Sequence, residues 1–174
     1  MRESANLNRI NEFMRAFGRA ARSECRVFFT GGTTAVLMGW RDSTIGINLK
    51  FDPELDELYR AIPAIKESLE INVELASPSD FIPAIPGWQD RCRYIGREGS
   101  VSFFHYDPYG QVLSKIERGH DQDILDVEAM IASGLVERGK LTDIFAQIEP
   151  LLYKYPAIDP ADFARQVSRV VESE

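Results

Sequence analysis

The stretch that decides the fold is FTGGTTAVLMGWRDSTIGINLKF, which spans residues 29–51. It predicts a strand that ends at the Gly31-Gly32 turn, a short helix over 33–38, and a second strand over 45–51. A glycine turn between a strand and a helix lets the backbone approach a phosphate closely, and the helix N-terminus beyond it favours an anion. The stretch therefore predicts a phosphate-binding turn, although a tight turn without a ligand explains the two glycines equally well.

The second strand of this stretch carries the main puzzle of the sequence. Ile47 and Leu49 alternate with Gly46 and Asn48, so the glycine and the asparagine share the face opposite the apolar one. A metal site on this strand would have its carboxylates on this polar face, because alternate residues of one strand place two ligands on the same side. Instead, position 46 offers no side chain and position 48 offers a neutral amide.

Length and composition indicate a soluble globular domain. The 174 residues are 44% hydrophobic and 27% charged, and the formal net charge is −7. This charge argues against broad nucleic-acid binding, but a local basic cleft remains open. No apolar run reaches the roughly 18 residues of a membrane span, so we expect a cytoplasmic protein without membrane contact. Cys25 and Cys92 form no CxxC pair and are expected as reduced structural thiols, with a disulfide or a reactive thiol as the alternative.

Periodicity, caps and turns predict the remaining elements. They are a helix from Asn6 or Asn8 to about residue 22, a strand over 26–30, a helix capped by Asp52 with Pro53 at its first position, a strand over 71–76, a hairpin of 91–95 and 100–106, a helix opened by Asp107-Pro108, and helices over 121–132, 141–153 and 160–171. The class is α/β (α+β), with the sheet built from residues 26 to 106 and a helical C-terminal third. We expect one compact domain, with a core over 1–120 and a helical region over 121–174 packed on it.

Three features together resemble a known fold. Gly-Gly-Thr opens a helix, Arg-Asp-Ser-Thr leads into a strand, and a glutamate follows in a later strand. This arrangement, from about Val27 to Val127, resembles the nucleotidyltransferase fold, and most closely the minimal bacterial nucleotidyltransferases that include abortive-infection toxin-like proteins. The resemblance implies a mixed sheet flanked by helices and metal-dependent transfer of a nucleotide from a nucleoside triphosphate to an RNA, protein or small-molecule acceptor. It also implies Mg²⁺ as the cofactor and a cognate partner protein of the toxin–antitoxin kind.

The resemblance also implies roles for particular residues. The nucleotide-binding turn is matched by Gly31, Gly32 and Thr33, with Arg41 and Ser43 just before the carboxylate strand. Glu74 matches the third acidic residue, as a metal ligand or as the base for the acceptor. Later elements are matched by Lys115, which would steady phosphate charge, and by Asp123 and Asp126, one of which would orient the acceptor.

The chain departs from the family pattern at the metal ligands. Gly46 and Asn48 stand where the Asp-x-Asp pair belongs. If the two strands are neighbours, Glu74 is the one charge left on that face, and Mg²⁺ prefers hard oxygen ligands that include carboxylates. We therefore expect weak or absent transfer activity. The chain is either a natural degenerate member or a variant altered at these two positions.

A second hypothesis is a non-catalytic module that binds a nucleotide in the same cleft or binds a partner protein. The partner surface would be an apolar stripe of Leu141, Ile144, Phe145, Ile148, Leu151 and Leu152, for which intramolecular core is the alternative. Each candidate site residue also has a structural alternative. Glu74 and Lys115 are otherwise surface residues, and Asp123 and Asp126 complement a helix dipole. Arg9, Arg15, Arg19 and Arg22 are expected on a solvated helix face.

Overall fold

The computed structural model describes residues 4–173, which form two compact units. The sheet unit comprises the described residues up to Ser77 together with Cys92–Tyr106, and the helical unit comprises Pro78–Arg91 together with the described residues from Asp107 onward. The helix over Pro108–Arg118 thus belongs to the helical unit. The boundary at residue 120 and the packing of the two parts stay predictions.

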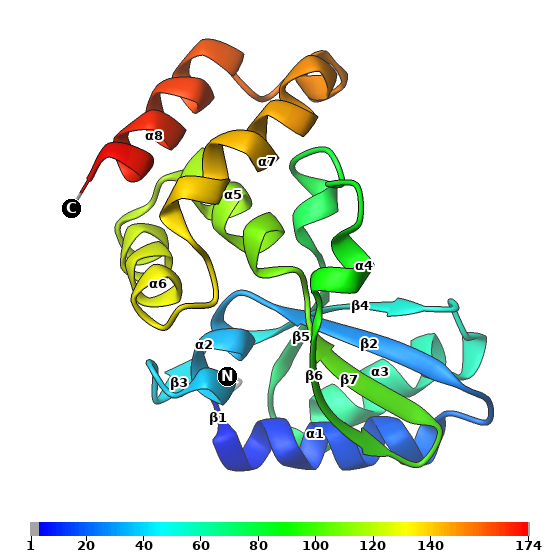
Figure 1. Cartoon of the computed structure of the whole chain (residues 1–174). Coiled ribbons are helices and arrows are strands. Elements are labelled where there is room, and N and C mark those ends of the chain that lie inside the picture. The colour runs from blue at the N-terminus through cyan, green and yellow to red at the C-terminus, as the bar shows by residue number, and fades with distance from the viewer. Residues whose placement is uncertain (1–3, 174) are drawn as a thin grey trace. The chain divides into compact units, whose positions relative to one another are not determined.

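The sheet unit is built on a mixed sheet, as the fold class requires (Figure 1). Its elements are β1 (Ala5–Asn6), α1 (Leu7–Ala20), β2 (Cys25–Thr30), α2 (Gly32–Met38), β3 (Ser43–Thr44), β4 (Gly46–Asp52), α3 (Asp56–Leu69), β5 (Asn72–Leu75), β6 (Arg93–Glu98) and β7 (Val101–His105). The five-stranded sheet has the order β5-β4-β2-β7-β6. β2 and β4 are antiparallel, as are β6 and β7, whereas β2 pairs with β7 and β4 with β5 in parallel. The predicted mixed α/β class is confirmed.

The helices α1 and α3 lie along one face of this sheet (Figure 1). Phe13 and Phe17 of α1 are fully buried against Phe29 and Phe51 of the sheet, with ring centroids 6.2 and 5.8 Å apart for the two contacts. Burial of apolar side chains at this helical spacing holds the helix on the sheet. Asn6 caps α1, since its Oδ1 accepts a hydrogen bond of 3.0 Å from the backbone N–H of Arg9. We call this the helix-covered face and the opposite one the second face.

One sequence prediction for this unit was wrong in detail. Asp52 does not cap a helix: it is the last residue of β4, it pairs with Arg26 of β2, and its carboxylate lies 3.5 Å from the Arg26 guanidinium. The helix begins only at Asp56. α3 is continuous through Pro63. Local cap chemistry at Asp52 is thus overridden by strand pairing.

The helical unit contains the predicted C-terminal helices. Its elements are η1 (Pro78–Asp80), α4 (Trp88–Arg91), α5 (Pro108–Arg118), α6 (Asp121–Ala132), η2 (Arg138–Lys140), α7 (Leu141–Ile148), η3 (Glu149–Lys154) and α8 (Pro160–Glu172). Asp107 caps α5 as expected, accepting 3.0 Å from the N–H of Tyr109. The α-helix predicted to reach Tyr153 ends at Ile148 and continues as a 3₁₀ segment, since Pro150 cannot donate the next helical hydrogen bond.

Candidate functional site

Strand pairing brings three polar residues into one row on the second face. Thr30 of β2 pairs with Asn48 of β4, and Asn48 pairs with Glu74 of β5. Directly paired residues on one face of a sheet place their Cβ atoms about 5 Å apart. We call Thr30, Asn48 and Glu74 the site row. The sequence had left open whether the strands of Asn48 and Glu74 are neighbours, and the structure shows that they are.

The glycine turn lies beside Asn48 of this row. Gly31 has φ 62° and ψ −132°, a conformation that favours glycine, and a Cβ there would lie 3.7 Å from Asn48 Nδ2. At Gly32 a Cβ would lie 2.0 Å from the Thr44 hydroxyl oxygen and 2.9 Å from Arg41 Nη1. Side chains are therefore excluded at Gly32, and the turn backbone is held beside a guanidinium and a hydroxyl. Such a combination suits a phosphate.

Of the two residues predicted just before β4, only Arg41 is placed at the turn by these contacts. Ser43 is exposed and pairs with Asn6 of β1. Its neighbour Thr44 instead carries the hydroxyl against Gly32, and it is buried. Sequence reasoning missed Thr44, although the two adjacent hydroxyl residues of the Arg-Asp-Ser-Thr segment were the available signal.

The first turn of α2 is held by a buried hydrogen-bond chain that the sequence did not reveal. The Thr34 hydroxyl donates 3.3 Å to the carbonyl of Phe29, and His105 Nδ1 lies 3.1 Å from the same hydroxyl oxygen. Burial, with a smaller contribution from the Arg93 charge, lowers the pKa of His105 to about 4, so its ring is neutral at pH 7. The neighbouring Thr33 is fully buried, and its hydroxyl has no hydrogen-bond partner within residues 4–173.

Position 46 has no room for a ligand side chain. A Cβ built on Gly46 would lie 2.9 Å from Asn72 Cβ and 3.1 Å from the Asn72 carbonyl oxygen. Both atoms belong to the paired part of β5, which cannot move without disturbing the sheet. An aspartate at position 46 is therefore incompatible with this strand pairing.

The donor set of the site row does not fit a dedicated Mg²⁺ site. Glu74 supplies one carboxylate, Asn48 a neutral amide oxygen and Gly46 nothing. Among the described residues, no group of three or more His, Cys, Asp or Glu side chains is placed to hold a metal. Asp52, the other carboxylate of β4, lies beside Arg26. Mg²⁺ sites in phosphoryl-transfer enzymes rely on carboxylates together with substrate phosphates, and this row retains a single one.

The remaining predicted site residues meet inside the helical unit. Lys115 Nζ of α5 lies 2.8 Å from Asp126 and 3.8 Å from Asp123, both on α6, and all three side chains are buried. Arg118 Nε donates 2.7 Å to Asp123. Burial raises the pKa of Asp123, but the Arg118 hydrogen bond and the nearby positive charges outweigh burial, and the net shift is downward. The cluster pairs its charges and joins α5 to α6, so its catalytic roles stay predictions.

A second buried ion pair of this unit was not foreseen. Asp107 is fully buried, and its Oδ2 accepts hydrogen bonds of 3.0 and 2.7 Å from Nε and Nη2 of Arg91. The apolar stripe of α7 is also internal, because Leu141, Ile144, Phe145 and Ile148 are buried and Phe145 meets Phe163 edge-on at 4.8 Å. The stripe thus serves as core.

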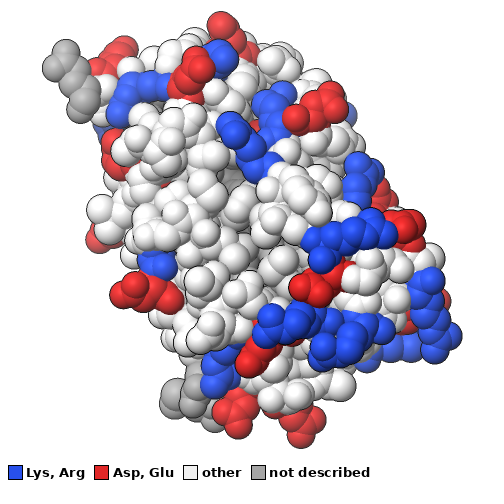
Figure 2. All heavy atoms as spheres, turned by 60° about the horizontal axis from the view of Figure 1, so that its bottom comes forward, with Lys and Arg blue, Asp and Glu red and all other residues white. Residues whose placement is uncertain are grey.

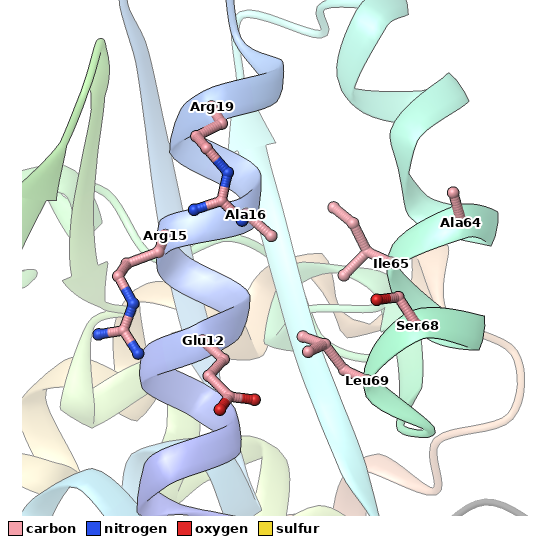
Figure 3. Close-up of a pocket in the computed structure, with 8 residues that line it drawn as sticks. All are labelled: Glu12, Arg15, Ala16, Arg19, Ala64, Ile65, Ser68 and Leu69. Carbon is pink, nitrogen blue, oxygen red and sulfur yellow. The ribbon is translucent and has the colours of Figure 1, made fainter.

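A hollow between α1 and α3 lies on the other side of the sheet from the site row. Arg15 and Arg19 extend from α1 beside it, and Ala16 and Ile65 face each other across it (Figure 3). Both arginines are exposed and make no ion pair or hydrogen bond with the described residues. Figure 2 shows basic side chains interspersed with acidic ones on the face that carries α1. This mixture matches a solvated helix face.

Comparison of the chain with models of known protein families gives one match. A family model described as nucleotidyltransferase of unknown function (DUF6036) matches residues 5–167. No curated protein and no solved structure matches the chain. None of the described helices is long and apolar enough to cross a membrane.

Proposed function

The chain belongs to the family of nucleotidyltransferases of unknown function, and on that premise we propose that it binds a nucleoside triphosphate at the site row but transfers nucleotides weakly or not at all. The phosphates lie on the backbone of Gly31 and Gly32 and against the guanidinium of Arg41. Glycine at both positions lets the backbone approach a phosphate closely, and Arg41 supplies the positive charge that a triphosphate requires.

The observation that carries this proposal is the pairing of Asn48 with Glu74. These residues occupy the position where two strands offer neighbouring ligands, yet only one of them is charged. Nucleotidyl transfer depends on positioning and on neutralising developing charge with metal ions held by carboxylates. The glycine turn and Arg41 supply groups that suit a phosphate, but the site row lacks most of the charge that a metal ion needs. In the family reaction, the acceptor would be an RNA, a protein or a small molecule.

The close packing around Gly46 favours one of the two explanations for the missing carboxylates. It favours a natural family member that lacks them over a variant in which residues 46 and 48 were both replaced. The two strands approach each other so closely at Gly46 and Asn72 that an aspartate does not fit between them. A scaffold that had merely lost a side chain would retain the space for it. The non-catalytic nucleotide-binding module is therefore the form of the proposal that the geometry supports best. A role as a toxin, or with a cognate partner protein, rests on the family resemblance alone.

The test is the single substitution Asn48→Asp, which places a carboxylate directly beside Glu74 without changing the side-chain volume. Wild type and N48D are incubated with labelled nucleoside triphosphates, Mg²⁺ or Mn²⁺, and RNA or lysate. We expect nucleotide binding by both proteins and metal-dependent label transfer only by N48D. Asn8→Asp, which adds the same charge at an exposed position of α1, is the matched control. Metal-dependent transfer by the wild type would overturn the proposed loss of activity, and failure of both proteins to bind nucleotide would overturn the proposal entirely.

A further inference from the structure

The Gly31-Gly32 turn depends on neighbouring groups for its conformation. Glycine loses more conformational freedom on folding than any other residue, so two successive glycines do not fix the turn by themselves. One backbone hydrogen bond closes the turn, from the N–H of Ala35 to the carbonyl of Gly31 at 3.1 Å. Groups that are held in place before a ligand arrives bind it more tightly, because less ordering is needed on binding. Further restraints on the turn therefore bear on its affinity for phosphate.

A side chain of α2 supplies a second closure of the turn. Thr34 is the third residue of α2, and its hydroxyl donates a hydrogen bond of 3.3 Å to the carbonyl of Phe29, five residues earlier. Phe29 lies in β2, and the same carbonyl also accepts 2.8 Å from the N–H of Tyr106. The hydrogen bond of Thr34 thus joins the first turn of α2 to the sheet, and residues 30–33 lie between its two ends.

His105 contacts this hydroxyl from a distant part of the sequence. Its Nδ1 lies 3.1 Å from the Thr34 hydroxyl oxygen, and both side chains are buried. His105 is the last residue of β7, and it pairs with Phe29 of β2 on one side and with Arg93 of β6 on the other. A residue on a strand that is paired on both sides holds its contacts more precisely than a residue on a loop.

The hydrogen bonds also determine the tautomer of His105. A hydroxyl has one hydrogen to donate, and that of Thr34 is directed at the Phe29 carbonyl, which can only accept. The hydroxyl oxygen is therefore the acceptor toward His105, so Nδ1 carries a hydrogen and donates it. Because the ring is neutral at pH 7, its Nε2 carries no hydrogen.

We propose that His105 is a positioning residue for phosphate binding, which donates its Nδ1–H to the Thr34 hydroxyl and thereby holds the Gly31-Gly32 turn in its binding conformation. This inference rests on the proposed binding of a nucleoside triphosphate and adds a residue of a distant strand to it. In this role His105 acts through Thr34 and makes no contact with the ligand. Its effect is on phosphate binding and is independent of the base.

The experiment measures dissociation constants for the four common ribonucleoside triphosphates and for inorganic tripolyphosphate by calorimetry. His105→Leu removes the hydrogen-bond donor, and Thr34→Val removes the hydroxyl with little change in size. We expect each variant to weaken binding of nucleotides and tripolyphosphate alike, by about fivefold, in line with the loss of one hydrogen bond. The amide of Asn can donate in place of Nδ1, so His105→Asn should retain most of the wild-type affinity.

A double variant tests whether the two residues act through one contact. His105→Leu/Thr34→Val should lose no more affinity than either single variant, because both substitutions break the same link. Val101→Ala is the matched control, since Val101 is buried at the other end of β7. It should lower the stability of the fold and leave both affinities unchanged. Nitrogen NMR of the wild-type ring at pH 7 should show the hydrogen of His105 at Nδ1.

Three results would overturn the positioning role while leaving nucleotide binding intact. They are wild-type affinities in folded His105→Leu and Thr34→Val, additive losses in the double variant, and a loss for nucleotides without one for tripolyphosphate. A ring hydrogen at Nε2 in the wild type would also overturn it, and this measurement does not require any variant to fold. If the wild type binds neither nucleotide nor tripolyphosphate, the proposed function itself fails and the positioning role fails with it.

Discussion

Asn48 and Glu74 are direct partners across the parallel pair of β4 and β5, and they face the same side of the sheet. This pairing joins an amide and a carboxylate at the position where the resemblance predicts acidic metal ligands. Neighbouring Gly46 is excluded from contributing, because its paired residue Asn72 occupies the space of a side chain. The site row thus carries a single carboxylate, that of Glu74.

Substitution at Gly46 should destabilise the protein. In Gly46→Ala, the added Cβ would lie 2.9 Å from Asn72 Cβ, so the two strands must separate locally. We expect a loss of about 1–3 kcal/mol in the free energy of unfolding, measured by urea denaturation. Gly96→Ala is the control, since a Cβ at that β6 position meets nothing within 4 Å. A Gly46→Ala protein as stable as the control would contradict the close approach of β4 and β5.

Arg41 should contribute to phosphate binding and not to base binding. Its Nη1 lies beside Gly32 at the turn. Arg41→Ala is expected to weaken nucleoside triphosphate and tripolyphosphate binding by the same factor, roughly tenfold or more, because a charge-assisted hydrogen bond is lost. Calorimetric titration of both ligands measures the two factors. Arg19→Ala removes an exposed arginine from α1 and should leave both affinities unchanged; equal losses in the two variants would point to a general charge effect.

His105 should make stability depend on pH in the mildly acidic range. Its pKa is lowered from 6.5 to about 4 in the folded chain, so the unfolded chain binds the proton more readily. The stabilisation is fully present above pH 6.5 and is lost as pH falls toward 4, by roughly 3 kcal/mol in total. Denaturant titrations of the wild type and His105→Gln at pH 7 and pH 4.5 measure the difference.

The substituted protein should lose less stability than the wild type between these two pH values, because carboxylates contribute equally to both. Identical pH profiles for wild type and His105→Gln would show that the buried hydrogen-bond chain of Thr34 and His105 is not maintained in solution.

The buried ion cluster of the helical unit should be essential for its stability. In Lys115→Met, the carboxylate of Asp126 loses its ammonium partner at 2.8 Å in a buried setting. We expect a loss of about 3–5 kcal/mol in unfolding free energy. The double variant Lys115→Met/Asp126→Leu should be more stable than the single one, because no unmatched charge remains.

Lys140→Met provides the comparison, since Lys140 pairs with Glu137 on the surface, and such pairs contribute about 0–1 kcal/mol. Thermal or denaturant unfolding distinguishes the three proteins. A double variant less stable than Lys115→Met would indicate that Asp126 has further essential partners.

Local patterns accounted for most of the secondary structure. Apolar spacing located α1 and α3, Asn6 is the observed cap out of the two candidates Asn6 and Asn8, and α6 was predicted at its observed bounds. The error at Asp52 occurred where a distant partner decided the outcome. Asp52 is a good cap by residue type, but pairing of its strand with Arg26 keeps it in the sheet. Strand pairing involves residues far apart in sequence, and no local pattern reports it.

The sequence by itself determined the glycine turn, the alternation that places Gly46 and Asn48 on one face, and the resemblance to nucleotidyltransferases. These depend on backbone conformation and on the period of two along a strand, both of which are local. Only the tertiary structure decided that Glu74 lies beside Asn48 and that Gly46 has no room for a carboxylate. Both depend on the register between strands, which side-chain packing selects when the sheet assembles.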